Sequence, residues 1–423
     1  MRRLLRILSR RAGGHGLLAT VALSTSVVAC GSPALSAAEQ GNLAKLQTEI
    51  AREHAQGKLS NGRAADLARA VAVREIATAK DEATALARLR DARACAGELD
   101  DALAQRMKTR DGAGAEAALS RLEDGNLSDG AARAWLDDAD DRWRAVSART
   151  LHRESDRTRR QAAMLDPSAR VRRAAIRAAA AANDASDLDI LFETARVDPE
   201  LLLRNEALRS MSAILRGVGD AARPKAADLA VRLRDLWTVG DDALKEDIAV
   251  AWGLRPVFEH GGREALRVVI STEKGPGAIA AAGVVLRNAS KDAELVSSAH
   301  ALLARTILDS SRRDRLHALA VARAQAPVLD AVRKAAADDD GEVKVAALAR
   351  LVDEKPHRDA AIKELFEIAG YGVSGAADDE RAFANAIRAR HVLASSGQLR
   401  VQAWIEKDLA SPESRRKTSA AFA

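Results

Sequence analysis

Apolar residues recur at helical spacing after a short turn near the middle of the chain. In the stretch from Asp166 to Ile176 and just beyond it, small or apolar residues stand five, eight, nine and twelve positions after the Asp. Residues at these intervals share one face of an α-helix, because the helix turns once every 3.6 residues. An Asp before a helix can accept a bond from an early amide, and a proline in the first turn loses no hydrogen bond. The pattern therefore predicts an amphipathic helix that follows an Asp-Pro turn.

The same skeleton recurs along the chain: an Asp, an apolar residue five positions later, a basic residue at six, and small or apolar residues at eight to ten. The clear copies start at Asp138, Asp166, Asp198 and Asp338, and weaker copies start near Val239, Lys274, Ser310, Asp378 and Ser411. Successive starts lie 28 to 41 residues apart, which is the spacing of a two-helix repeat. An upstream segment such as 159–165 supplies the other helix of each pair. Because one pair cannot bury its apolar face alone, we expect neighbouring pairs to stack.

From residue 129 onward these copies resemble the HEAT repeat, and the likeness is carried by the pattern Asp-Pro-x-x-x-Val-Arg-x-x-Ala-Ala. The resemblance implies an all-α, armadillo-type fold, an α-solenoid of stacked antiparallel helix pairs wound into a right-handed superhelix. It also implies a ladder in which the turn Asp and the basic residue six positions later link adjacent repeats. The ladder positions are Asp138 and Arg144, Asp166 and Arg172, Asp198 and Arg204, and Asp338 and Lys344. Armadillo and tetratricopeptide solenoids are the alternatives, and the irregular spacing argues against the latter.

Residues 41–128 show helical spacing without the repeat skeleton. Four segments show this helical spacing, 43–54, 62–78, 82–106 and 114–122, and glycines lie near their ends. We expect a helical N-terminal region that is either a cap or a set of degenerate repeats.

The first 30 residues carry a different pattern. Five arginines and no acidic residue precede Cys30, and residues 17–29 form an uncharged stretch of 13 residues, shorter than the roughly 20 that span a bilayer as a helix. The end of this stretch, Val27-Val28-Ala29-Cys30, resembles the lipobox of bacterial lipoproteins. That resemblance implies that Cys30 is acylated and becomes the new N-terminus. The alternative is an ordinary signal peptide cut nearby, which would release a free protein.

This resemblance divides the chain into a signal peptide (1–29), a flexible tether (30–40), the N-terminal helical region (41–128) and the repeat solenoid (129–423). The mature protein would be held in the cell envelope by the lipid on Cys30, which would be its only attachment to the membrane. Lipoproteins retained at the inner membrane typically carry Asp after the acylated cysteine, and this chain has Gly31 there. We therefore expect the outer membrane, facing the periplasm.

Removal of the signal changes the charge balance. The chain has 66 basic and 60 acidic residues, and loss of the five signal arginines leaves 61 against 60. Overall charge therefore gives little support for a nucleic-acid partner. The charge is locally uneven, however, because eleven arginines and only three acidic residues lie between positions 142 and 177, both included.

In three consecutive clear repeats an arginine stands eleven positions after the turn Asp. On the helix this position shares a face with the residues four and seven positions after the Asp. In a stack these side chains would align as an arginine ridge, formed by Arg142, Arg149, Arg170, Arg173, Arg177 and Arg209. Guanidinium groups bind carboxylates and phosphates at two points, so the ridge predicts a partner-binding surface. The alternative is a solvated face whose charges pair with local acids. Aromatic residues near the ridge are few, which argues against a stacking platform for single-stranded nucleic acid.

The sequence offers no catalytic or metal-binding pattern. Its eight histidines are scattered and none has the spacing of a metal site, so we expect no metal and no cofactor. Gly370 to Gly375 matches G-x-G-x-x-G, but the segment that enters it, 361–368, has helical and not strand spacing. We therefore expect a loop between helices and no dinucleotide site. Cys95 is predicted to be a packing residue.

These observations predict a lipid-anchored envelope protein that acts as a non-catalytic protein-binding scaffold and not as an enzyme. The expected partner is another envelope protein, which would place an acidic segment along the arginine ridge. The alternative is a nucleic-acid-binding helical-repeat enzyme resembling the DNA-alkylation-repeat glycosylases, although export and the near-neutral mature charge make nucleic acid an unexpected partner. A repeat chaperone of the lyase type, which assists cofactor attachment, is a third interpretation that no residue specifically supports.

Replacement of Cys30 by Ser tests the predicted anchor. The hydroxyl cannot form the thioether that carries the lipid, so the variant should move from the membrane fraction to the soluble fraction and lose incorporation of labelled fatty acid. The measurement is fractionation with immunoblotting of cells that express either form. A variant that stays with the membrane as fully as the native chain would contradict the anchor.

Overall fold

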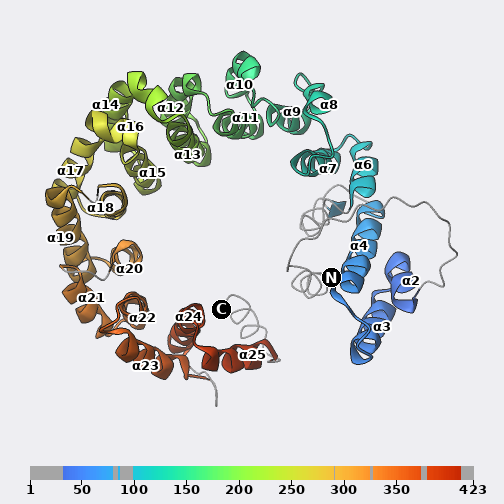
Figure 1. The fold of residues 1–423 in the computed structure, drawn as a ribbon. Helices are drawn as coiled ribbons and strands as arrows, with labels where there is room; N and C mark the ends of the chain where they lie inside the picture. Colours follow the sequence, from blue (N-terminus) through green and yellow to red (C-terminus); the bar gives the residue numbers. More distant parts are fainter. Residues whose placement is uncertain are drawn as a thin grey trace. The chain divides into compact units, whose positions relative to one another are not determined.

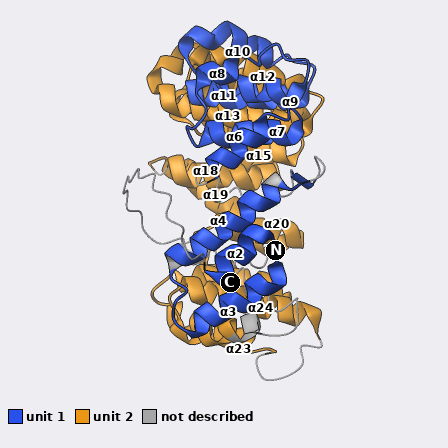
Figure 2. Ribbon diagram, turned by 90° about the vertical axis from the view of Figure 1, so that its right-hand side faces the viewer, with its two compact units in different colours: residues 1–182 blue, residues 183–423 orange. Residues whose placement is uncertain are grey.

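The computed structural model describes residues 32–79, 84–85, 99–289, 291–323, 327–372 and 379–410. All regular elements in these ranges are helical, and no strand occurs among them. The predicted all-α class is therefore confirmed. The chain divides into two compact units, residues 1–182 and 183–423 (Figure 2).

Unit 1 contains α-helices of 5 to 17 residues. In chain order they are α2 (Pro33–Gln40), α3 (Leu43–Ala55), α4 (Asn61–Ala77), α6 (Asp100–Met107), α7 (Gly112–Glu123), α8 (Asp129–Arg133), α9 (Asp141–Ala148), the 3₁₀ turn η2 (Glu154–Asp156), α10 (Arg157–Ala163) and α11 (Ala169–Ala182). Helix α7 packs against α9 and α9 packs against α11, while α8 and α10 each contact the helix that follows them. The predicted domain boundary before residue 129 thus lies inside unit 1, because α7 contacts both α8 and α9 across it.

The segment expected to be a flexible tether, 30–40, is helical from Pro33 onward. The Ser32 side chain accepts a hydrogen bond from an early amide, and Pro33 occupies the first turn, where its missing N–H is not needed. Three alanines of α2 are fully buried and pack in one cluster with Leu46 and Leu67. The tether prediction is therefore wrong for α2, because small residues after a capped turn favour a packed helix.

A second difference concerns the helix predicted over 82–106. Leu99 has a non-helical backbone and α6 starts directly after it, so the helix is not continuous through this point. Asp100 and Asp101 occupy the first turn of α6, where acidic side chains interact favourably with the helix dipole. The other predicted N-terminal helices agree with α3, α4 and α7 to within two residues.

Unit 2 contains α-helices of 3 to 18 residues. In chain order its elements are η3 (Ala185–Asp187), α12 (Leu188–Val197), α13 (Leu201–Val218), η4 (Gly219–Ala222), α14 (Arg223–Val239), α15 (Asp242–Trp252), α16 (Arg255–Val257), the π-helical turn η5 (Phe258–Gly262), α17 (Arg263–Thr272), α18 (Pro276–Asn288), α19 (Ala293–Asp309), α20 (Arg312–Val321), α21 (Leu329–Ala336), α22 (Gly341–Val352), α23 (Arg358–Ala369), α24 (Glu380–Ser395), η6 (Leu399–Val401) and α25 (Gln402–Ala410).

The helices of unit 2 form two rows, as Figure 1 shows. The first row contains α12, α14, α17, α19, α21 and α23, and the second row contains α13, α15, α18, α20, α22 and α24. Successive second-row helices contact one another, and each also contacts at least one first-row helix. This is the packing of an α-solenoid, in which each pair buries its apolar face against the next.

Each repeat start identified in the sequence comes just before the second helix of a helix pair. The starts at Asp138, Asp166, Asp198, Val239, Lys274, Ser310, Asp338 and Asp378 precede α9, α11, α13, α15, α18, α20, α22 and α24 respectively. In three weak copies the residue five positions after the start is buried, at Leu244, Ile279 and Phe383, whereas the copy at Ser310 has Arg315 at this position. The copy expected at Ser411 lies outside the described residues.

Unequal helix lengths explain the unequal repeat spacing. The 28-residue interval after Asp138 covers α9 and α10, which have 8 and 7 residues. The 41-residue interval after Asp198 covers α13 and α14, which have 18 and 17 residues. Length therefore varies between repeats while the phase of the buried positions stays the same.

Gly262 directly precedes α17, and its substitution tests how closely the chain is packed at the start of this helix. A Cβ atom at this position would lie 2.4 Å from the Trp252 carbonyl oxygen and 2.9 Å from that of Val257. Because both contacts are with backbone, Gly262→Ala should lower the free energy of unfolding by about 1–3 kcal/mol, measured as a lower urea midpoint by circular dichroism. The control is Gly130→Ala in α8, where a Cβ would meet nothing within 4 Å, and which should be neutral or slightly stabilising. Equal midpoints for the two variants would contradict the close approach.

Candidate functional site

Each clear repeat begins with the same folded turn. The carboxylate of the turn Asp accepts a hydrogen bond from the amide two residues later, at 2.8–2.9 Å in Asp138, Asp166, Asp198 and Asp338. The helix then begins three residues after the Asp, and the N-cap residue in α9, α13 and α22 is the one just before the helix. The Asp-Pro pattern predicted a helix cap at the turn Asp itself. The structure shows an Asx turn there instead, because this short side chain bonds most readily to the backbone two residues on.

The basic residue six positions after the Asp closes this turn. Arg144 donates to the carbonyl oxygen of Asp138 at 2.9 Å, Arg172 to that of Asp166 at 3.0 Å, and Arg204 to that of Asp198 at 2.6 Å. Lys344 differs, because its ammonium group binds Glu364 of α23 at 2.6 Å. The three arginines therefore tie the second helix to the turn that starts it.

Arg144 also binds the next repeat. Its Nε and Nη2 atoms donate to the two carboxylate oxygens of Asp166 at 3.1 and 3.0 Å. Burial opposes ionisation of Asp166, but the Arg144 hydrogen bond and the Ser168 amide outweigh it and hold the pKa of this carboxyl below its usual value. Equivalent pairs join Arg110 to Asp138 and Arg315 to Asp338. Sequence reasoning missed both arginines, because Arg110 precedes the first repeat and Arg315 stands where the skeleton has an apolar residue.

Five members of the predicted arginine ridge lie in unit 1. Arg142 is on α9, Arg149 ends that helix, and three more stand on α11, which packs against α9. Arg142 is held by Asp140, which accepts from its Nη2 and Nε atoms at 2.8 and 3.0 Å. The sixth member, Arg209, is on α13 of unit 2 and binds Asp247 of α15 at 3.0 Å.

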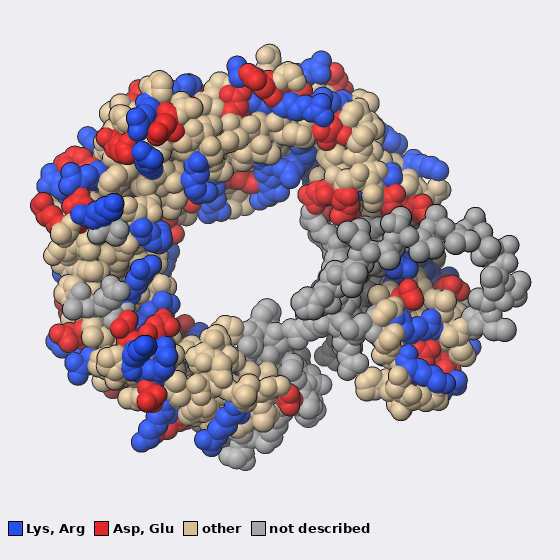
Figure 3. All heavy atoms as spheres, viewed as in Figure 1, with Lys and Arg blue, Asp and Glu red and all other residues tan. Residues whose placement is uncertain are grey.

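Three exposed arginines of the ridge stand on one helix, α11. Arg170, Arg173 and Arg177, called here the arginine row, are all exposed. Helix α11 has no acidic residue of its own, and its fourth arginine, Arg172, is turned to the backbone of the preceding turn. In Figure 3, Lys and Arg atoms gather over the part of unit 1 that Figure 1 labels α9 and α11. The arginine row is the candidate functional site.

Charges on the second row of unit 2 pair across neighbouring helices. The ion pairs are Arg209 with Asp247 between α13 and α15, Asp242 with Arg313 between α15 and α20, Arg312 with Asp340 and Glu342 at α22, and Glu342 with Arg388 of α24. Glu246 of α15 also contacts the ring of His317 of α20. The N–O distances in five of these contacts run from 2.9 to 3.9 Å. This surface of unit 2 therefore neutralises much of its own charge.

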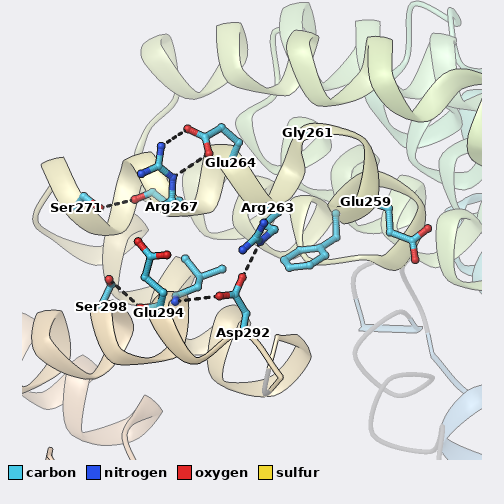
Figure 4. A pocket seen from close by; sticks show the side chains of 11 residues that line it. Glu259, Gly261, Arg263, Glu264, Arg267, Ser271, Asp292, Glu294 and Ser298 are labelled. Carbon is cyan, nitrogen blue, oxygen red and sulfur yellow. Dashed lines mark hydrogen bonds and ion pairs between the residues drawn. The ribbon is translucent and has the colours of Figure 1, made fainter.

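A groove of about 620 Å³ runs between α17 and α19 (Figure 4). Its arginines are engaged: Arg263 binds Asp292 at 2.6 Å, and Arg267 binds Glu264 at 2.6 Å. These hydrogen bonds hold the pKa values of Glu264 and Asp292 below the usual range. The paired carboxylates are therefore ionised at neutral pH and poorly suited to donate a proton.

Other sequence candidates are placed as follows. His300 is buried in α19, and burial lowers the pKa of its ring. The segment entering the glycine-rich stretch at 370 is helix α23, as expected. In the described part of the chain, His, Cys, Asp and Glu side chains do not gather in groups that could hold a metal ion, and no helix there combines the length and apolar character needed to cross a membrane. Cys30 and Cys95 lie outside the described residues.

No protein-family model matches the chain, and no curated protein matches it significantly. The HEAT-repeat likeness and the lipobox therefore stay predictions from the sequence.

The contact between Arg144 and Asp166 predicts a measurable coupling. The side chains keep 18% and 15% of their surface exposed, so the pair should contribute about 1 kcal/mol in a double-mutant cycle with Arg144→Ala and Asp166→Ala. The measurement is urea unfolding of the four forms at pH 7.

Acid should remove this coupling. The pKa of Asp166 is lowered by folding, so its contribution is complete above the unfolded pKa of about 4 and is lost as the pH falls through the folded value. The control cycle uses the exposed pair Glu193 and Arg196 within α12, for which about 0.3 kcal/mol is expected. A coupling at Arg144 no larger than this would contradict the assigned link between repeats.

Proposed function

We propose that the chain is a lipid-anchored envelope protein that acts as a non-catalytic, protein-binding scaffold, with the arginine row of α11 as a contact surface. The observation that carries this proposal is the concentration of exposed positive charge on one helix that has no acidic residue of its own. Guanidinium groups recognise carboxylates at two points, so an acidic segment of another envelope protein fits this surface.

The rigidity of α11 supports a binding role. Its opposite face is buried at Val171, Ala175 and Ile176, and Arg172 ties its first turn to the backbone of residues 166 and 167. A surface held in this way loses little conformational entropy when a partner binds, which favours affinity.

A protein partner is favoured over nucleic acid by the placement of the aromatic residues. Trp143 is 1% exposed, packs edge-on against Trp135 and is covered by Arg110. It cannot offer a face on which a base could stack. Together with the near-neutral charge expected for the mature chain, this argues against the helical-repeat glycosylase alternative.

The proposed location of the protein in the cell is supported by the sequence alone. The lipobox-like end at Cys30 favours lipid attachment, and Gly31 after it favours the outer membrane, facing the periplasm. Helix α2 begins at Pro33, so a lipid on Cys30 would hold the first helical cluster of unit 1 close to the bilayer.

Charge reversal of the arginine row tests the proposed surface. The triple variant Arg170→Glu, Arg173→Glu and Arg177→Glu should reduce recovery of cross-linked envelope partners by roughly tenfold, because three exposed ion pairs become repulsive. The measurement is quantitative mass spectrometry of proteins captured on the purified chain, with thermal unfolding of each variant recorded by circular dichroism.

The matched control reverses three arginines on another side of unit 1, Arg153, Arg157 and Arg159, of which the last two lie on α10. It changes the net charge by the same amount and should leave the captured proteins unchanged. Unchanged capture by a correctly folded arginine-row variant would refute the surface. Salt-dependent binding of duplex DNA by the native chain, lost in the same variant, would favour the nucleic-acid alternative.

A further inference from the structure

The groove between α17 and α19 has a polar wall on each helix (Figure 4). On α17 the lining residues Arg263, Arg267 and Ser271 follow one another at intervals of four, and residues at this interval share one face of a helix. They span about 12 Å along the axis, at 1.5 Å per residue. The lining residues on α19 are Glu294, Leu295 and Ser298. The α17 wall is therefore one polar stripe that faces a second helix.

The charged side chains of the groove hold one another in place. Arg267 donates from its Nε and Nη2 atoms to the two carboxylate oxygens of Glu264, at 2.8 and 2.6 Å. Arg263 donates from Nε to one oxygen of Asp292 at 2.6 Å, and the other oxygen accepts from the Leu295 amide at 3.2 Å. A ligand therefore meets side chains whose orientation is already restrained, which lowers the entropic cost of binding.

These pairs leave hydrogen-bonding capacity for a ligand. A guanidinium group has five N–H donors, of which Arg267 uses two and Arg263 uses one in the contacts above. An ionised carboxylate only accepts, through about four lone pairs, and Glu264 and Asp292 are ionised at neutral pH. Ser271 donates to the carbonyl oxygen of Arg267 at 2.7 Å, so its own oxygen is left to accept. The groove thus offers donors and acceptors side by side.

The same pairing argues against a strongly charged ligand. An anion would have to compete with Asp292 for Arg263 and with Glu264 for Arg267. It would also meet Glu294 on the α19 wall, whose charge already acts on both arginines. A cation would meet the two guanidinium groups on the α17 wall. The groove therefore favours a ligand that forms many hydrogen bonds and carries no charge.

The π-helical turn η5 adds an aromatic ring at the start of the α17 wall. Phe258 lines the groove and is partly exposed. Gly261, which also lines it, has no side chain to fill the space. Glu259 points away from the other labelled side chains (Figure 4) and binds Arg255 at 3.1 Å. Next to the ion pairs the ligand therefore finds an aromatic surface.

We infer that the groove between α17 and α19 binds a neutral oligosaccharide. A sugar hydroxyl both donates and accepts, as a serine hydroxyl does, so neighbouring hydroxyls can donate to the carboxylate and accept from the guanidinium of one pair. The C–H face of a sugar ring can cover Phe258, because the face of an aromatic ring is electron-rich. This site goes beyond the protein-binding role proposed above and does not depend on the arginine row.

An extended peptide suits the groove less well than a sugar. Its backbone offers one donor and one acceptor per residue, whereas a sugar ring presents several hydroxyls that do both. Of the lining residues, Phe258 and Leu295 are the large apolar ones, and Leu295 is buried. Apolar side chains of a peptide would therefore find little surface to cover.

Binding of small probes to the full chain tests the inference. The neutral sugars are cellotriose and maltotriose, the anionic sugar is trigalacturonate, the cationic probe is spermidine, and the neutral peptide is hexaglycine. Dissociation constants are measured at neutral pH and low salt by saturation-transfer NMR. We expect saturable binding of a neutral trisaccharide, about tenfold tighter than that of any other probe.

Glu264→Gln then tests whether the ion pair selects the ligand. The variant loses the charge that engages Arg267, so affinity for the neutral sugar should fall about tenfold, as expected for one charge-assisted hydrogen bond. Affinity for trigalacturonate should rise, because the released arginine can bind its carboxylates. The matched control is Asp330→Asn in α21, which makes the same charge change in another i, i+3 pair, with Arg333 at 3.6 Å. It should leave every affinity unchanged.

The remaining outcomes would overturn the inference. Absence of binding by either neutral sugar, or an equal loss in the Glu264 and Asp330 variants, would show that the groove is not a sugar site. Tighter binding of trigalacturonate or spermidine to the native chain would contradict the selection of a neutral ligand. Tighter binding of hexaglycine, weakened by Glu264→Gln, would replace the sugar by a peptide. None of these results bears on the arginine row, because Glu264 lies in unit 2.

Discussion

The turn that opens each clear repeat is the constraint on which the rest of the structure depends. A carboxylate folds back on the amide two residues later, as in Asp166. In three of the four clear repeats an arginine in the first turn of the next helix also binds the carbonyl oxygen of the same Asp, as Arg172 does. This pair of contacts sets the direction in which the second helix leaves the turn. Because the apolar face of that helix is buried only when its neighbour presents a matching face, an error in direction at one turn would misplace the packing of the next repeat.

Charge is distributed differently on second helices of the two units. In unit 2 the exposed charges of α13, α15, α20, α22 and α24 pair across helix boundaries, so they join neighbouring repeats. Individual surface pairs contribute little to stability, but a connected set restrains the helices it joins. In unit 1 the arginines of α11 are not matched by acids on their own helix. Arginines thus join neighbouring repeats in both units, through Arg144 and Asp166 in unit 1 and through Arg209 and Asp247 in unit 2. The arginines of α11 are the ones proposed above to contact a partner.

Much of the architecture could be predicted because it is local in the sequence. The burial of Leu244, Ile279 and Phe383 follows from helical periodicity alone. Counting residues from each repeat start in the same way also places the arginine row on one face of α11. The pairing of Arg209 with Asp247 could not be predicted, since 38 residues separate them and only the stacking distance brings them together. The helix at Pro33 was missed because glycine, serine and proline near a lipobox suggested a tether, whereas the alanines that follow are buried by Leu46 and Leu67 of later helices. Sequence reasoning thus found which face is buried but not which distant side chains meet.

The unequal helices have a consequence for how such a chain can change. Helices α13 and α14 are more than twice as long as α9 and α10, and their outer ends carry aliphatic side chains in solvent, at Leu201, Leu202 and Val239. A helix in a stack needs to match its neighbours only over the length they share, and surplus turns project beyond it. Insertions and deletions near the ends of helices can therefore accumulate over generations without disturbing the common core, which gives this architecture an unusual tolerance of genetic change in length.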